Sequence, residues 1–208
     1  MLMRIGRYFS LLMVILFTTN SFAEEPGACI NSDEAELLQL VDDYRAENDL
    51  TSVPWSQSIM TVAQWHAVDA ALNAQLMFVR NCNLHSWSGT RPDIWSGGCY
   101  TSDHKNAAMM WNKPKEITGG IYTAYGFENA ASGYSSVAAA LNGWKGSAGH
   151  NAVILNEGIW ASYPWRAMGV GVDLDKRYYY LWFSTAVDPQ GDMPLCSDET
   201  SIFLSGFE

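Results

Sequence analysis

Four histidines are the side chains of this sequence best suited to acid–base or metal chemistry near neutral pH. They are His66, His85, His104 and His150. An imidazole titrates close to neutral pH and is the commonest metal ligand in proteins. His66 falls on the apolar stripe of an expected helix, which predicts a buried, hydrogen-bonded histidine of the core. The other three lie in expected loops or helix starts, where functional sites tend to be built.

The four cysteines have the pattern of a disulfide-linked domain. They are Cys29, Cys82, Cys99 and Cys196, and no Cys-x-x-Cys pair occurs among them. Four cysteines allow three pairings. We favour Cys82–Cys99, which would close a local loop rich in glycine and tryptophan, and this leaves Cys29–Cys196 to join the two ends of the domain. Neither a structural zinc site nor a cysteine nucleophile is expected.

The first 23 residues have the features of a secretory signal peptide. Arg4 and Arg7 precede an apolar run from Phe9 to Phe17, and Ser21-Phe22-Ala23 has small residues where a signal peptidase cuts. An uncleaved membrane anchor is the alternative, but this run is too short to span a bilayer, and no later run is long enough. We therefore expect a secreted protein, extracellular or periplasmic, in an environment where disulfides persist.

Composition limits the chain to one folded domain. It has 208 residues, of which 48% are hydrophobic, 13% aromatic and 16% charged, and a net charge of −10. That length fits one domain, and the low charged fraction excludes a disordered or coiled-coil chain. Nucleic acid is not expected as a partner, because binding it requires a basic face.

The elements that must position the histidines begin with two expected helices. The first is expected to begin at Asp33, with Glu36 completing a capping box, and the second to begin after Ser56. Residues 80–120 show no lasting period, so we expect a long loop there that is cross-linked by the local disulfide.

The C-terminal half is expected to alternate short helices and strands. We expect a short strand over 121–127, a helix capped by Ser135 or Ser136, a helical turn over 149–155, and a hairpin of strands over 168–172 and 178–183. Helices with a small antiparallel sheet define the α+β class. The sequence has no HExxH, GxSxG or Walker motif.

Five blocks of sequence occur in an order typical of one family. They are LLQLVDDYRAENDL with VPWSQSIMTVAQWHAVDAA, NLHSWSG, GFENAASGYSS, NGWKGSAGHNAVILN and AMGVGVD. Over roughly residues 33–185 the chain resembles the CAP superfamily of SCP-domain proteins, and its bacterial branch most. The resemblance implies a three-layer α–β–α sandwich around a small antiparallel sheet. The expected organisation is a signal peptide over 1–23, a CAP domain over 24–187 and a C-terminal tail over 188–208.

The resemblance also implies a central cleft with two histidines and acidic residues. The first histidine matches His85, the first acid matches Glu128 and the second histidine matches His150. The second acid of the family is missing here, because Lys145-Gly146-Ser147 follows the tryptophan of the third helix and Ala167 stands before the GVGV strand.

This cleft is a candidate metal site. His85 and His150 are the expected ligands of zinc or another divalent ion, with Glu128 orienting a ligand or a bound water. A hydrogen-bonded polar cluster without metal is the alternative interpretation. His104 is either a further ligand or, as we favour, an exposed loop histidine.

Tryptophans cluster in the segments that follow the histidine-bearing blocks. Those singled out are Trp87, Trp95, Trp111, Trp160 and Trp165. They either form small cores beneath irregular loops, which we favour, or line the cleft as a stacking surface for sugar, peptide or lipid.

Three functions are compatible with these features. The first is a secreted binding or interaction module for an extracellular lipid, glycan or peptide. The second is a metal-assisted hydrolase, peptidase-like or lytic, with Glu128 as the catalytic base. The third and weaker one is lipid or sterol capture. The missing second acid favours the binding module over an enzyme, because hydrolysis needs both a base and an acid.

Overall fold

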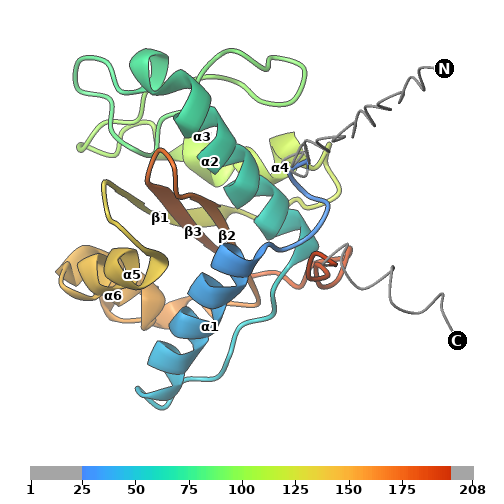
Figure 1. Cartoon of the computed structure of the whole chain (residues 1–208), viewed down its shortest axis with the longest axis vertical. Helices are drawn as coiled ribbons and strands as arrows, with labels where there is room; N and C mark the ends of the chain where they lie inside the picture. The colour runs from blue at the N-terminus through green and yellow to red at the C-terminus, as the bar shows by residue number, and fades with distance from the viewer. Residues whose placement is uncertain (1–24, 198–208) are drawn as a thin grey trace, which may run out of the picture.

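The chain forms a layered sandwich around a small antiparallel sheet in the computed structural model, which describes residues 25–197. The strands β1 (Gly126–Ser132), β2 (Ala167–Asp173) and β3 (Tyr178–Ser184) lie in the order β1-β3-β2. The sheet therefore places β3 at its centre and β1 and β2 at its edges (Figure 1).

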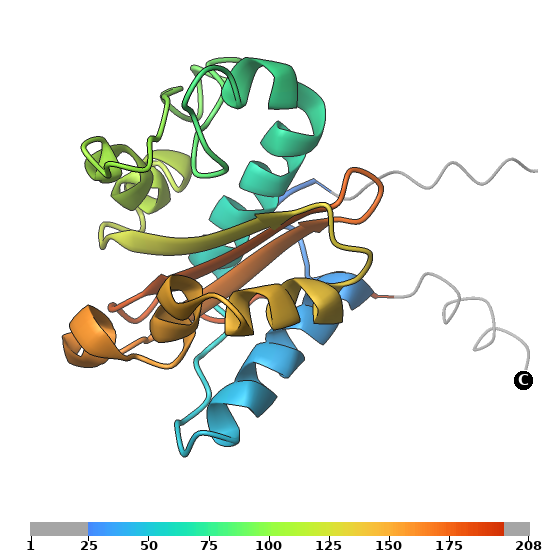
Figure 2. The ribbon, with the colours of Figure 1, turned by 90° about the vertical axis from the view of Figure 1, so that its left-hand side faces the viewer.

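Helices cover both faces of this sheet. Figure 2 views the sheet close to edge-on, with α2 (Gln57–Met77) on one face and α1 (Ser32–Ala46) and α5 (Val137–Lys145) on the other. The short α6 (Ala148–Ile154) follows α5 on the same side. This arrangement confirms the α+β class and the three-layer architecture.

Alternation along the strands divides the buried side chains between two cores. On β3, Tyr180 and Trp182 pack with side chains of α2, whereas Tyr179 and Leu181 pack with side chains of α1 and α5. Residues of β1 follow the same rule, so consecutive residues of this edge strand face opposite layers.

Glycines bring α2 into close contact with β2. A Cβ atom added at Gly171 would lie 2.0 Å from the carbonyl oxygen of Ala63, and one added at Gly169 would lie 2.4 Å from the amide nitrogen of Met60. No side chain fits at either position without moving the helix. The alternating glycines of β2 therefore determine how closely α2 sits on the sheet.

Two of the expected helix starts are confirmed and one is wrong. Ser56 caps α2 and Ser136 caps α5. The capping box of α1 is formed by Asn31 and Glu34 instead of Asp33 and Glu36. The Asn31 side chain accepts from the amides of residues 33 and 34, so the helix begins earlier than the acidic pattern suggested.

The segment between α2 and β1 differs from expectation in two ways. The strand predicted over 121–127 lies over 126–132, where buried residues continue without a break. The long loop of residues 80–120 contains the short helices α3 (Ala107–Trp111) and α4 (Lys113–Ile117). A 3-10 helix, η1 (Gly158–Ser162), precedes β2.

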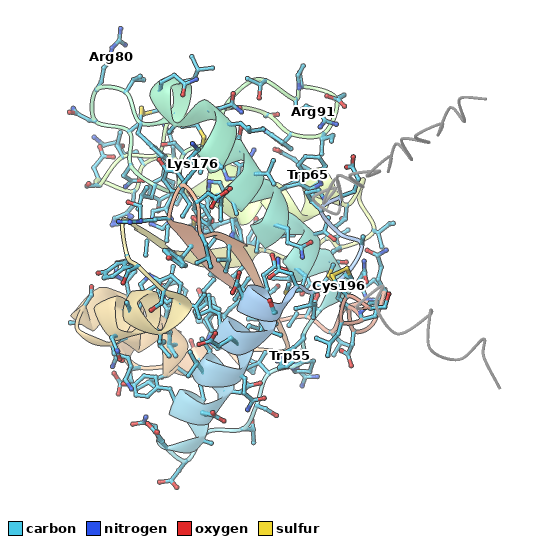
Figure 3. All side chains as sticks on the ribbon, viewed as in Figure 1. Trp55, Trp65, Arg80, Arg91, Lys176 and Cys196 are labelled. Carbon is cyan, nitrogen blue, oxygen red and sulfur yellow. A yellow bond between two sulfur atoms is a disulfide. The ribbon has the colours of Figure 1, made fainter. Side chains whose placement is uncertain are left out.

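Both predicted disulfides are confirmed, Cys29–Cys196 and Cys82–Cys99. Figure 3 shows Cys196 in its disulfide next to the start of α1. The expected signal peptide lies outside the described residues, as does the tail beyond residue 197. Within residues 25–197 no helix is long and apolar enough to cross a membrane.

Candidate functional site

A cleft of about 470 Å³ opens at the β1 edge of the sheet. One wall comes from the segment that leads into α3, and the other from α6 and η1. The residues that line it include His85, Tyr100, His104, Met110, Trp111, Glu128, Asn129, Ser147, His150, Val153, Ile159 and Trp160. The structure thus brings His85, Glu128 and His150 to one place, although each belongs to a different element.

Two consecutive residues of β1 each hold one of the cleft histidines. Glu128 Oε1 accepts a hydrogen bond from His85 Nδ1 at 2.6 Å on the α2 side of the sheet. Asn129 Nδ2 donates to the carbonyl oxygen of His150 at 2.9 Å on the opposite side. The alternation of the strand therefore anchors the imidazole of His85 from one layer and the main chain of His150 from the other layer at one edge.

His66 is a third histidine of this network. Its Nδ1 lies 2.5 Å from Glu128 Oε2, and its ring stacks on Trp87 and Tyr180 at centroid distances of 4.0 and 3.9 Å. The sequence correctly predicted a buried, hydrogen-bonded histidine, because His66 is fully buried. It gave no sign that this histidine contacts Glu128, since only the packing of α2 on the sheet brings the two together.

The hydrogen bond between His66 and Glu128 requires a proton on one of the two partners. His66 Nε2 lies 2.9 Å from the carbonyl oxygen of Ser86, which can only accept, so Nε2 carries a hydrogen. The 2.5 Å contact of Nδ1 with Glu128 then needs one further proton, on the ring or on the carboxyl group. In both forms the pair is neutral overall, which makes its complete burial tolerable.

The electrostatics favour an ionised Glu128 and a neutral His150. Burial alone would raise the pKa of Glu128, but the charge and hydrogen bond of His66, with those of His85, bring the pKa below its usual value. Burial, and then repulsion from His85, lower the pKa of His150. His85 consequently donates from Nδ1 to a carboxylate.

The carboxylate of Glu128 is not available to a ligand in the cleft. Its side chain is completely buried, and its two oxygens accept from His66 and His85. It lies behind the His85 ring as the partner that orients it, in the manner of the carboxylates that orient metal-binding histidines. A base acting on water in the cleft would need an exposed oxygen, which Glu128 does not have.

The donors that fit a metal ion are two imidazole nitrogens. His85 and His150 both bind protein partners through Nδ1, to Glu128 and to Ser147 Oγ, so Nε2 of each ring has no hydrogen-bond partner in residues 25–197. No group of three or more His, Cys, Asp or Glu side chains in that range could hold a metal ion. Two imidazoles are one fewer than the three protein ligands of a catalytic zinc site.

The remaining sequence candidates divide between the cleft and the core. His104 is exposed, as expected for a loop histidine, yet it lines the cleft beside Tyr100, whose hydroxyl lies 2.9 Å from His104 Nδ1. Trp111 and Trp160 line the cleft. Three other tryptophans, Trp87, Trp95 and Trp165, are buried in the cores. The tryptophans therefore divide between the cleft wall and the cores, and a stacking role for those in the wall stays a prediction.

Comparison with known proteins identifies the family. The model of the cysteine-rich secretory protein family (CAP) matches residues 38–184, so the chain belongs to the CAP family. An extracellular protein containing an SCP domain from Bacillus anthracis str. Ames has a similar fold, with 23% identity and a TM-score of 0.50. A cysteine-rich secretory protein from Staphylococcus aureus subsp. aureus Mu50 is 14% identical, with a TM-score of 0.47.

These comparisons cover 74% of this chain but only 40% and 38% of the two solved chains. This chain thus spans less than half the length of either protein. No curated protein sequence matches it significantly.

Proposed function

We propose that this chain is a secreted binding module that takes an extracellular ligand in the cleft between His85 and His150. The observation that carries this proposal is that β1 anchors both cleft histidines from opposite layers, through the imidazole of His85 and the main chain of His150. Within residues 25–197 Nε2 of each ring has no partner, and the other walls of the cleft are largely apolar. Clefts of this size with a few fixed polar groups are typical ligand sites.

Secretion is part of this proposal. Its support is the signal-like sequence of residues 1–23, the two disulfides, and the extracellular relative from Bacillus anthracis. Disulfides persist in extracellular and periplasmic environments.

A divalent ion is a second ligand that we propose for the same cleft, and His85 and His150 are the residues that would hold it. Such an ion would supply positive charge and open coordination positions for an oxygen of the ligand. Titration with ZnCl2 tests this, because His85→Ala and His150→Ala should each weaken binding at least about tenfold. The matched variant His104→Ala should leave it unchanged, and equal binding by all three variants would contradict the assignment.

The binding module is tested with four probes on the protein that begins at residue 24: ZnCl2, a long-chain fatty acid, a linear oligosaccharide and a library of acetylated, amidated hexapeptides. We expect at least one to shift the NMR signals of His85, His150 and Trp160 together. If no probe does so, the cleft is not a binding site.

A matched pair of variants locates the binding. Ile159 on the cleft wall is 78% exposed, and Leu72, on α2 and outside the cleft, is 69% exposed. Ile159→Glu should weaken binding at least about tenfold, because it places a charge in an apolar wall, and Leu72→Glu should not. An equal effect of both variants would contradict binding in the cleft.

A further inference from the structure

The register of the sheet shows which main-chain groups of β1 face its free edge. Gly133 N donates to the carbonyl oxygen of Arg177 at 2.8 Å, and this pair continues the register in which Ser132 lies opposite Tyr178. Hydrogen-bonded and non-hydrogen-bonded pairs alternate along an antiparallel ladder. Odd-numbered residues of β1 therefore bond to β3, whereas Glu128 and Ala130 direct their N–H and C=O groups away from it.

Two other edge positions of the sheet have hydrogen-bond partners. On β2, Met168 N donates to the carbonyl oxygen of Pro54, and the carbonyl oxygen of Met168 accepts from Ser56 N, both at 2.9 Å. On β1, Trp144 Nε1 donates to the carbonyl oxygen of Ala130 at 3.3 Å. Within residues 25–197 the main-chain N–H and C=O of Glu128 have no such partner, so the edge is open at this residue.

The open position faces the cleft. Glu128 as a residue is 6% exposed, whereas its side chain is 0% exposed. The exposed atoms of Glu128 therefore belong to its main chain. Because Glu128 also lines the cleft, the surface that it presents there is the peptide backbone and not the carboxylate.

We propose that the main chain of Glu128 pairs with an extended peptide, which adds a short strand to the free edge of β1 inside the cleft. This rests on the proposed binding function and specifies the class of its ligand. An N–H and a C=O of one strand residue match the C=O and N–H of one residue of an antiparallel peptide. A lipid chain offers neither group and would leave both of these polar groups unpaired.

The cleft walls then determine which side chains the peptide carries. Neighbouring peptide residues point to opposite faces of the extended sheet, toward Met110 and Trp111 on one side and toward Val153 and Trp160 on the other. A peptide with large apolar side chains at consecutive positions fits both walls. Pairing ends at Ala130, whose carbonyl oxygen already accepts from Trp144, so the added strand is short.

The first measurement is amide hydrogen exchange of the protein that begins at residue 24. We expect the amide of Glu128 to exchange at least about a hundredfold faster than those of Phe127 and Asn129, which bond to β3. Equal protection of all three amides from exchange would show that the edge is not open at Glu128.

The second measurement uses the best binder of the acetylated hexapeptide library. We expect its binding to slow exchange of the Glu128 amide. N-methylation of one peptide residue should weaken binding about tenfold, whereas N-methylation of the adjacent residues should change it less than about twofold. Ile159→Glu should also weaken it, with Leu72→Glu as the control.

Each other outcome has a distinct meaning. Binding of a hexapeptide that leaves the Glu128 amide unchanged, or that is equally sensitive to N-methylation at every residue, would overturn strand addition. If only the fatty acid or only the oligosaccharide binds in the cleft, the proposal of a peptide ligand is overturned, whereas the proposed binding function stands. If no probe binds in the cleft, both proposals fail.

Discussion

Glu128 Oε2 lies 2.5 Å from His66 Nδ1, and this contact joins the core beneath α2 to the wall of the cleft. The same carboxylate accepts from His85 through its other oxygen, at 2.6 Å. A histidine with no exposed surface thus helps to position a histidine that a ligand can reach.

Removing the ring nitrogens of His66 should strongly destabilise the protein. His66→Phe leaves the carboxylate of Glu128 buried with a single partner, and breaking a buried charged pair costs about 3–5 kcal/mol. The free energy of unfolding in urea measures this loss. His66→Phe combined with Glu128→Gln should recover part of it, because no unpaired charge is then buried. A loss no larger than that of the exposed control His104→Ala would show that the His66–Glu128 contact contributes nothing.

The purified domain should show no robust peptidase or glycosidase turnover, with or without ZnCl2. Both carboxylate oxygens of Glu128 contact histidines, Lys145 lies over the ring of Tyr44 at 3.9 Å, and Ser147 contacts His150. None of these three side chains is therefore available as a general acid. A missing general acid costs about 10²–10⁴-fold in rate. Fluorogenic peptide and glycoside substrates test this. Zinc-dependent cleavage that disappears in folded His85→Ala and Glu128→Gln variants would make the hydrolase the leading function.

Stability should fall as pH rises through the range set by Glu34. Burial, partly offset by hydrogen bonds from Gln64 and Asn31, raises the pKa of Glu34 from 4.5 to about 7. Between pH 4.5 and pH 7 the folded state binds more protons than the unfolded state. The contribution of Glu34 to the free energy of unfolding is therefore fully present below pH 4.5 and is lost as pH rises through 7. The change amounts to roughly 3 kcal/mol.

Unfolding in urea at pH 5 and pH 8 measures this dependence. Glu34→Gln keeps an acceptor for both hydrogen bonds and removes the charge. The free energy of unfolding of this variant, relative to that of the original protein, should therefore be higher at pH 8 than at pH 5. If the free energy of unfolding changes by the same amount between pH 5 and pH 8 in both proteins, the pH dependence does not come from Glu34.

Adding one methyl group at Gly171 should destabilise the domain. The new Cβ would meet the Ala63 carbonyl oxygen at 2.0 Å, which forces α2 away from β2 and costs about 1–3 kcal/mol or more. Gly149→Ala is the matched control, because a Cβ there meets no atom within 4 Å and lies in a helix. Equal melting temperatures for the two variants would refute the close contact.

Sequence alone determined the class of fold, most element positions and both disulfides. Helical stripes, strand alternation and capping residues are local signals, because each depends on side chains only a few positions apart. The errors at the start of α1 and at β1 are also local. Asn31 competed with Asp33 as the cap, and the unbroken burial of β1 leaves no alternation to read.

Only the tertiary structure decided what the site residues do. The resemblance indicated His85, Glu128 and His150, but it could not show that the Glu128 carboxylate turns into the core while its main chain faces the cleft. That orientation follows from the register of β1 against β3 and from the packing of α2, which places His66 beside Glu128. Contacts between residues 62 positions apart in the chain leave no periodic signal in the sequence, because they depend on how whole elements pack.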